Sequence, residues 1–218
     1  HPDLRRHLSV QASASNPEAI RFYQEEFDVK RVVLPRVLTL PEISALNREI
    51  QVESEVFVFG GLCVMAEGRC ALSSYVTGQS PNTNGVCAPA CAVRYEDEGD
   101  RLVSRLADFT INTFAPGEAA GYPTLCKGRF IANGKTSYLF EDPVSLNAAT
   151  MLQDLAAAGV SGLKIEGRQR GKAYVAKVVT SFRRSIDSTH DSNVEVDDLI
   201  SVTEGQRRTA GAYDKTWR

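Results

Sequence analysis

The 218-residue sequence is poor in several features that define common protein classes. It has three histidines, so a histidine-rich zinc site and a histidine-dependent hydrolytic triad are both poorly supported. No apolar run approaches the roughly 20 residues that a membrane-spanning helix needs. With 25 basic and 27 acidic residues, the chain also lacks the overall positive charge typical of nucleic-acid-binding domains. The 43% hydrophobic and 24% charged content is ordinary for a folded domain, which excludes disordered and collagen-like chains.

Cysteine is absent outside one stretch of the chain. All five cysteines lie between Cys63 and Cys126, within a segment (60–143) that is rich in Gly, Pro and Asn. An odd number of cysteines in one segment favours metal binding or catalysis over a disulfide framework, and we expect a cytoplasmic protein. The first residue is His1 rather than Met, and we expect the sequence to be a segment of a longer protein.

What the sequence does contain is an alternation of strand and helix patterns. Four apolar or alternating runs predict β-strands, at 7–13, 31–36, 53–59 and 163–166. Four stretches with helical periodicity follow them, at 17–27, from Thr39, from Ser145 to Gly159, and at about 171–187. Asn16 before Pro17 is an N-cap signal, and Thr39 with Glu42 is a capping box. This alternation predicts βαβ units and a parallel sheet.

The predicted strands become polar toward their C-terminal ends, where a (β/α) barrel places its active site. The polar residues are Gln11, Ser13, Arg36, Glu55, Lys164 and Glu166. The predicted fold class is therefore α/β: the C-terminal half of a (β/α) TIM-like barrel, with about four parallel strands and a Cys-rich insertion. An open α/β sheet is the alternative, although strands buried on both of its faces should be almost continuously apolar.

The expected domain organisation follows from this pattern. The barrel strand–helix units occupy 1–59, the Cys-rich insertion 60–143, the last barrel helix–strand–helix 144–187, and a polar C-terminal tail 188–218, which is expected to be loosely held until 211–217. Within the insertion, Asn133-Gly134 predicts the tip of a hairpin.

The cysteine spacing bears on the kind of metal site. Six, sixteen and thirty-eight residues separate Cys63, Cys70, Cys87 and Cys126, and Cys91 follows Cys87 after three more. No two-residue gap typical of structural zinc sites occurs, which disfavours zinc. Four thiolates from separated loops can hold a [4Fe–4S] cluster, and nearby glycine N–H groups and cations such as Lys127 would offset its negative charge. The alternative is that these are ordinary buried cysteines.

Three segments, 59–94, 122–129 and 164–168, resemble the collagenase-like peptidase family. The resemblance covers nearly the whole chain and is greatest to the ubiquinone-biosynthesis branch, the UbiU-like proteins. It implies a [4Fe–4S] cluster on Cys63, Cys70, Cys87 and Cys126. Phe59, where many relatives carry histidine, also favours this branch. Cys91 departs from the pattern: it is either a replacement ligand or a spare thiol.

The resemblance further implies an oxygen-independent hydroxylase subunit that acts on the ring of a ubiquinone precursor. Its partner would be a UbiV-like protein in a heterodimer, prephenate a candidate oxygen donor, and nucleic acid is not an expected partner. Lys164, Glu166 and Arg168 are the candidate catalytic residues, because a cationic group at the barrel mouth could bind the carboxylates of the donor. The alternative is a structural ion network among these three residues.

Other functions stay open at this point. The same family contains proteins that hydroxylate tRNA or rRNA bases, and such a function predicts a basic, stacking-capable surface. Proteolysis is less well supported, because the sequence has no GxSxG or HExxH motif and no convincing Cys/His pair. The cluster could also be an electron carrier or a structural staple in a larger complex.

Overall fold

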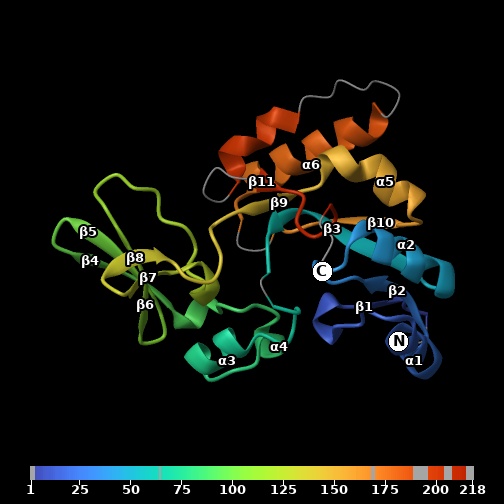
Figure 1. The fold of residues 1–218 in the computed structure, drawn as a ribbon, viewed down its shortest axis with the longest axis horizontal. Coiled ribbons are helices and arrows are strands. Elements are labelled where there is room, and N and C mark those ends of the chain that lie inside the picture. The colour runs from blue at the N-terminus through green and yellow to red at the C-terminus, as the bar shows by residue number, and fades with distance from the viewer. Residues whose placement is uncertain (1–2, 64, 168–169, 189–195, 204–207, 215–218) are drawn as a thin grey trace. The chain divides into compact units, whose positions relative to one another are not determined.

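A computed structural model describes residues 3–63, 65–167, 170–188, 196–203 and 208–214 (Figure 1). The chain divides into two compact units. The first unit comprises His1–Cys63 together with Val144–Arg218, and the second comprises Val64–Pro143. Each unit has a hydrophobic cluster of its own.

The first unit is built on a sheet that contains six strands within the described residues. They are β1 (Arg6–Leu8), β2 (Val29–Val33), β3 (Glu53–Gly61), β9 (Ser145–Asn147), β10 (Gly162–Ile165) and β11 (Arg208–Thr209). β1, β2, β3 and β10 are parallel: β2 pairs with β1 and β3, and β10 pairs with β3. β9 runs antiparallel to β3 and parallel to β11. The predicted parallel sheet is confirmed, whereas its membership of a half-barrel stays a prediction.

Helices of the first unit bury apolar side chains against this sheet. They are α1 (Pro17–Phe27), α2 (Leu40–Glu49), α5 (Leu152–Ala157) and α6 (Lys172–Asp187). The core combines sheet residues such as Val32, Val56 and Val58 with Ile43 of α2 and Phe182 of α6. Removal of these large apolar side chains from water supplies the main driving force for the unit's folding.

The predicted helix starts are confirmed in atomic detail. Asn16 accepts a hydrogen bond from the Ala19 N–H at 2.8 Å and so caps α1. At α2, Glu42 accepts from the Thr39 N–H at 2.7 Å, while Thr39 Oγ1 accepts from the Glu42 N–H at 3.4 Å. The capping box therefore satisfies amide groups that have no partner within the helix.

Three expectations about the first unit are wrong. The strand predicted at 7–13 ends at Leu8, because Val10–Ala12 forms a short 3₁₀ helix, η1. The helix predicted from Ser145 begins later: Ser145–Asn147 is strand β9, buried along its length beside the end of β3. Helical structure there starts with η4 (Ala149–Met151).

The third error concerns the tail from 188 onward, part of which lies outside the described residues. Its described part is not loosely held, since η5 (Val196–Val202) packs against α6. Leu199 is buried in the core cluster, and so is Tyr213, which lies in the stretch where the tail was expected to be held. A few apolar side chains therefore anchor a segment whose composition is mostly polar.

The second unit contains two small antiparallel sheets. One is formed by β4 (Val93–Glu98), β5 (Arg101–Leu106) and β6 (Phe109–Phe114), the other by β7 (Arg129–Ala132) and β8 (Lys135–Tyr138). The short helices are α3 (Ala71–Thr77), α4 (Pro81–Asn84), η2 (Ala90–Ala92) and η3 (Leu125–Lys127). The predicted hairpin at Asn133-Gly134 is confirmed, and both residues have the positive φ that such a turn requires.

Across the described residues, no helix combines the length and the apolar composition that are needed to cross a bilayer.

Candidate functional site

Glu55 is a nearly buried charged residue of β3; it lies near the start of this strand (Glu53–Gly61) and not toward its C-terminal end, where the sequence pattern placed it. Its side chain is 12% exposed and accepts hydrogen bonds from Lys164 Nζ at 2.8 Å and Arg31 Nη1 at 3.3 Å. Because Lys164 lies on β10 and Arg31 on β2, one carboxylate links the two strands that flank β3. Burial alone raises the pKa of Glu55, but the hydrogen bonds and charges of Lys164 and Arg31 together hold it below its ordinary value.

A second ion pair lies just beyond the strands. Arg36, which follows β2, donates from Nη2 to Glu166 Oε2 at 2.9 Å, and Glu166 directly follows β10. The Arg36 guanidinium also lies 3.6 Å from the centroid of the Phe57 ring. Lys164 Nζ lies 5.9 Å from the same centroid, so two cations share one aromatic ring.

The structure thus joins some sequence-predicted residues and leaves others apart. Lys164 pairs with Glu55, near the start of β3, and Glu166 pairs with Arg36, just after β2, so each candidate contacts a residue from another part of the sheet. Arg168 lies outside the described residues. Gln11 and Ser13 belong to the turn at η1 after β1. The strand-end cluster, defined here as Arg31, Arg36, Glu55, Phe57, Lys164 and Glu166, carries the cationic groups that the sequence predicted; their role in catalysis stays a prediction.

Sequence reasoning missed Arg31 and Phe57 as members of this cluster. A signal was present: Glu55 and Phe57 are two positions apart on β3 and therefore project from the same face. The parallel neighbour β2 brings Arg31 next to Glu53, and Arg31 Nε donates to that carboxylate at 2.8 Å. The strand register, which the sequence does not state, turns these separate charges into one network.

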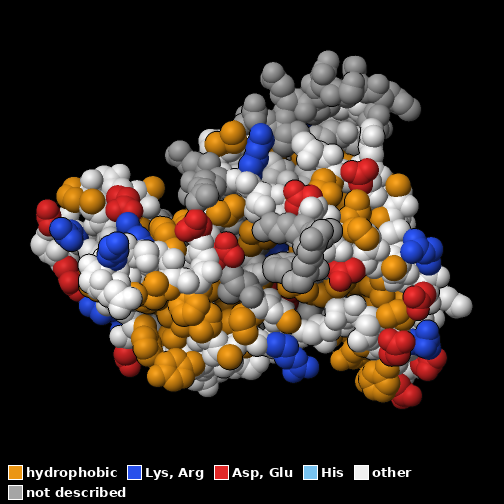
Figure 2. Space-filling view, viewed as in Figure 1, with side chains coloured by type: hydrophobic (Ala, Val, Ile, Leu, Met, Phe, Trp, Pro, Cys, Tyr) orange, Lys and Arg blue, Asp and Glu red, His pale blue; other side chains and the backbone are white. Residues whose placement is uncertain are grey.

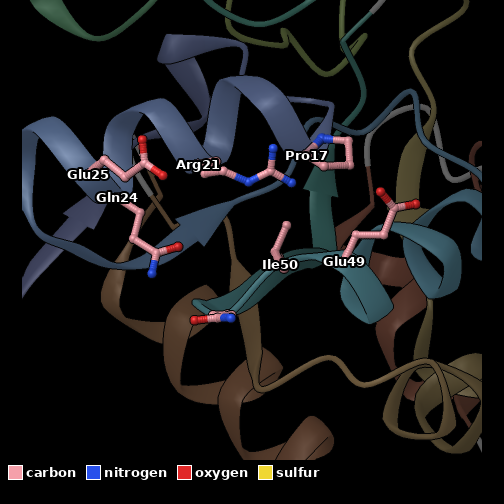
Figure 3. Close-up of a pocket in the computed structure, with 7 residues that line it drawn as sticks. Pro17, Arg21, Gln24, Glu25, Glu49 and Ile50 are labelled. Atoms are coloured by element: carbon pink, nitrogen blue, oxygen red, sulfur yellow. The ribbon is translucent and has the colours of Figure 1, made fainter.

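A pocket elsewhere on the first unit does not coincide with these residues (Figure 3). It has a volume of about 140 Å³ and is lined by Pro17, Arg21, Gln24, Glu25, Glu49, Ile50 and Gln51. Its walls come from α1 and from the segment that joins α2 to β3. None of the sequence-predicted site residues lines it, and we do not assign it a role in the candidate site.

The second unit gathers thiols around α3. Cys70 is the N-cap of α3, where its Sγ accepts the Ser73 N–H at 3.4 Å. Ser73 also donates from Oγ to the Cys87 carbonyl at 2.6 Å, so one serine connects two cysteine segments that lie far apart in the sequence. Both Cys87 and Cys91 are exposed.

Cys126 joins this region through η3, which packs against α3. Burial raises the pKa of the Cys126 thiol; the charge of Lys127 opposes this, and the nearby Cys70 thiol adds to it.

The Tyr122 hydroxyl donates to the Ala88 carbonyl at 2.9 Å. Burial raises the pKa of Tyr122, and the charges of Tyr95, Cys87 and Cys91 raise it further. Cys126 therefore lies near Cys70, and Tyr122 lies near Cys87 and Cys91. Ser73 of α3 connects the two groups, so these four cysteines share one neighbourhood.

The donor chemistry of this neighbourhood suits a cluster with thiolate ligands. It provides thiols, a backbone N–H on a sulfur, and a lysine beside Cys126. Among the described residues, no group of three or more His, Cys, Asp or Glu side chains is arranged to hold a single metal ion. Cys63 belongs to the first unit, and the four-thiol [4Fe–4S] site stays a prediction.

Comparison with known proteins shows which family this α/β chain represents. The family model of peptidase family U32 matches residues 1–212, and the chain belongs to that family. It is 32% identical to tRNA hydroxylation protein P of Escherichia coli (strain K12) over 94% of the chain and 49% of the relative. It is 26% identical to the 23S rRNA 5-hydroxycytidine C2501 synthase of the same organism, over 94% of the chain and 26% of the relative.

A third relative has a name of another kind: the chain is 28% identical to a collagenase of Porphyromonas gingivalis (strain ATCC BAA-308 / W83), over 84% of the chain and 39% of the relative. The chain spans about half the length, or less, of the curated relatives it matches. No solved structure matches it. The expected membership of the collagenase-like peptidase family is thus confirmed, and these names concern RNA hydroxylation and collagen cleavage rather than ubiquinone.

Proposed function

We propose that this chain is part of an enzyme that hydroxylates a base of tRNA or rRNA. The observation that carries this proposal is the similarity, over 85% or more of the chain, to relatives named for tRNA hydroxylation, two of which are 31–32% identical to it. The relative named as a 23S rRNA 5-hydroxycytidine synthase extends the reaction class to a second kind of RNA. The proposal replaces the ubiquinone precursor with RNA as the expected substrate.

The charge distribution supports an RNA substrate, although the whole chain has a net charge of -2. Between Lys164 and Arg184 the sequence has seven basic residues and one acidic residue, a local excess of six positive charges. Within this stretch, α6 exposes Lys172, Arg183 and Arg184, of which Arg183 pairs with Asp187 on the same helix. A concentrated set of exposed cations attracts the phosphate backbone of RNA and gives binding a strong dependence on salt.

The cysteines and the strand-end cluster have separate parts in this proposal. Cys63, Cys70, Cys87 and Cys126 would hold a [4Fe–4S] cluster, which supplies electron-transfer chemistry when bound. The Ser73 N–H and Lys127 would offset the negative charge of its thiolates. Lys164, whose side chain is 41% exposed, would bind a carboxylate of an oxygen donor such as prephenate in exchange for its contact with Glu55.

Ubiquinone-precursor hydroxylation with a UbiV-like partner is the second candidate function. It rests on the resemblance of the cysteine spacing and on Phe59 in place of histidine. Phe59 is fully buried and packs edge to face against Phe182, with 5.8 Å between ring centroids. Packing in the core alone therefore explains phenylalanine at this position. Phe59 is for that reason weak evidence for a ubiquinone-related function.

The deciding experiment removes the full-length gene from its host and grows the cells without oxygen. Nucleosides from digested tRNA and rRNA are then compared by mass spectrometry with those of the parent, and quinones are extracted from the same cultures. We expect a hydroxylated nucleoside to disappear and to return when the gene is restored, but not when the restored copy carries Cys70→Ala. Intact nucleosides together with a missing quinone would overturn the RNA proposal in favour of the second candidate.

A further inference from the structure

The second unit carries an exposed apolar surface that the proposed chemistry does not use. Figure 2 shows hydrophobic side chains gathered over the part of this unit that holds α3 and β6. The two large residues in contact there are Tyr75 of α3, which is 77% exposed, and Phe109 at the start of β6, which is 40% exposed. Their ring centroids lie 5.9 Å apart and their planes are inclined by 58°. Exposed apolar area of this kind is available to a ligand.

The backbone beneath both rings is firmly held. Phe109 pairs with Leu106 at the turn between β5 and β6, and the Ala107 N–H donates to the Ala92 carbonyl at 2.7 Å. On the other side, Ser73 ties α3 to the Cys87 carbonyl, and Val76, next to Tyr75, is buried in the unit's core. Because the backbone on both sides is fixed, the protein would lose little conformational entropy when a ligand stacks on the rings.

The size of the ring pair distinguishes between kinds of partner. A fully covered aromatic side chain buries about 150–250 Å², so the two rings together offer at most about 500 Å². A stable protein interface needs about 800 Å² on each partner. One or two flat bases fit this smaller area, and base–aromatic stacking is the usual way in which proteins hold unpaired RNA bases.

The rim of the surface has a cation placed for a phosphate. The Arg94 guanidinium donates from Nη2 at 2.9 Å to the Ala107 carbonyl, which lies two residues before Phe109 in the chain. It also lies 3.5 Å from Glu96 and 3.8 Å from Asp108, so a phosphate that binds Arg94 has to displace at least one of these two carboxylates. Half of the Arg94 side chain is exposed and can meet a backbone phosphate beside the stacked base.

We propose that Tyr75 and Phe109 form a stacking platform for an unpaired base of the RNA substrate; this inference rests on the proposed function. Tyr75 lies five residues after Cys70 on the same helix, about 7.5 Å along its axis and turned by about 140°. The role of the platform is to position single-stranded RNA, and a loop or an unpaired end is the kind of RNA it selects.

The test measures the affinity of the full-length protein for a single-stranded RNA of about 12 nucleotides, and for the same strand in a duplex, over a range of salt concentrations. For Tyr75→Ala or Phe109→Ala we expect single-strand binding to weaken by about five- to hundredfold. The slope of log affinity against log salt should stay unchanged, because no phosphate contact is lost. For Arg94→Gln we expect that slope to fall by about 0.7, the value for one phosphate contact on a single strand.

Two further variants separate stacking on a π-face from a general apolar contact. Tyr75→Trp should bind like the unaltered protein, whereas Tyr75→Leu, which keeps apolar area without a π-face, should bind as weakly as Tyr75→Ala. Phe22→Ala is the matched control, since Phe22 is 54% exposed on α1 and belongs to another aromatic contact pair, with Phe27. We expect Phe22→Ala to leave RNA binding unchanged.

Several outcomes would overturn the inference. Unchanged single-strand affinity in Tyr75→Ala would do so, as would normal RNA binding by Tyr75→Leu, which would indicate a general apolar contact and not stacking on a π-face. If the gene deletion removes a hydroxylated nucleoside and Tyr75→Ala restores it as efficiently as the unaltered gene, the platform is wrong and the proposed function stands. If the unaltered protein binds no RNA and the deletion leaves all nucleosides intact, the proposed function fails as well.

Discussion

Arg36 and Glu166 stand 130 positions apart in the sequence and are joined by an ion pair with 2.9 Å between Nη2 and Oε2. The Arg36 side chain is 9% exposed and the Glu166 side chain 41%. The pair connects the end of β2 to the end of β10, on either side of β3. Its position at the strand ends gives it two possible roles, to brace the sheet or to bind a carboxylate ligand, and these roles differ in what they predict for stability.

Glu166→Gln removes the negative charge but keeps the size of the side chain. We expect the free energy of unfolding to fall by about 1–2 kcal/mol, because a nearly buried guanidinium loses a charged acceptor that is itself partly exposed to water. Urea unfolding of the unaltered protein, of Glu166→Gln and of Asp187→Asn measures the stability lost in each variant. Asp187 pairs with Arg183 on an exposed part of α6, and its loss should change stability by less than about 0.5 kcal/mol. Equal effects of the two variants would contradict a bracing role.

Glu55 predicts how stability depends on pH. Its pKa in the folded protein is below the ordinary value of 4.5: burial raises it, but the hydrogen bonds and charges of Lys164 and Arg31 outweigh that effect. A depressed pKa means that the carboxylate contributes stability above pH 4.5, and that this contribution disappears as the pH falls through the lower, folded value. The stability difference between the unaltered protein and Glu55→Gln should therefore be full at pH 7 and shrink below pH 4.5. Chemical unfolding at several pH values measures it; a difference that does not change with pH would refute the argument.

Gly60 is expected to tolerate no side chain. Its φ is +135°, and a Cβ at this position would lie 2.5 Å from the Glu166 Cβ. Gly60→Ala should lower the free energy of unfolding by about 1–3 kcal/mol and displace Glu166 from Arg36. Gly121→Ala is the control, because no atom lies within 4 Å of a Cβ there and its backbone is not in the left-handed region. Thermal unfolding distinguishes the two, and a Gly60→Ala protein as stable as Gly121→Ala would show that the close approach is not real.

Tyr213 should anchor the C-terminal segment to the sheet. Its buried hydroxyl donates to the Phe57 carbonyl at 2.5 Å, across 156 positions of sequence. Tyr213→Phe deletes this bond and should lower the free energy of unfolding by about 1 kcal/mol. Tyr95→Phe removes a comparable bond to the Gly121 carbonyl, 3.0 Å long but exposed, and should have a smaller effect. If urea unfolding showed a larger loss of stability in Tyr95→Phe than in Tyr213→Phe, the C-terminal segment would contribute little to stability.

The cysteines can be ranked by their contribution to iron binding. After purification without oxygen, we expect iron and sulfide content to fall sharply in Cys63→Ala, Cys70→Ala, Cys87→Ala and Cys126→Ala. Cys91→Ala should keep full iron content, because the UbiU-like spacing that the other four cysteines match does not include Cys91. Loss of iron in Cys91→Ala with retention in Cys87→Ala would reassign the ligand, and iron-free protein under all conditions would remove the cluster from the proposal.

Much of the first unit could be predicted because its signals are local. Asn16 and Thr39 cap helices through atoms within three residues of themselves, and the Asn133-Gly134 turn of the second unit forms with its own backbone. Strand β9 gave no such signal, since Ser145–Asn147 is a three-residue strand that is buried only because the end of β3 lies beside it. Val10 looked like part of a strand for a related reason: its alternating neighbours satisfy the pattern, but the chain turns at Ser13 with a positive φ.

The sequence alone determined the alternation of parallel strands and helices, the helix caps, the family and the presence of charged residues at the strand ends, because each depends on neighbours along the chain or on a linear pattern. The tertiary structure decided which charges meet. Lys164 contacts Glu55, and Glu166 contacts Arg36, through the parallel pairing of β2, β3 and β10. It also decided that Tyr75 and Phe109, 34 positions apart, would share one exposed surface. Contacts of this kind depend on strand register and packing across the fold, which no single stretch of sequence encodes.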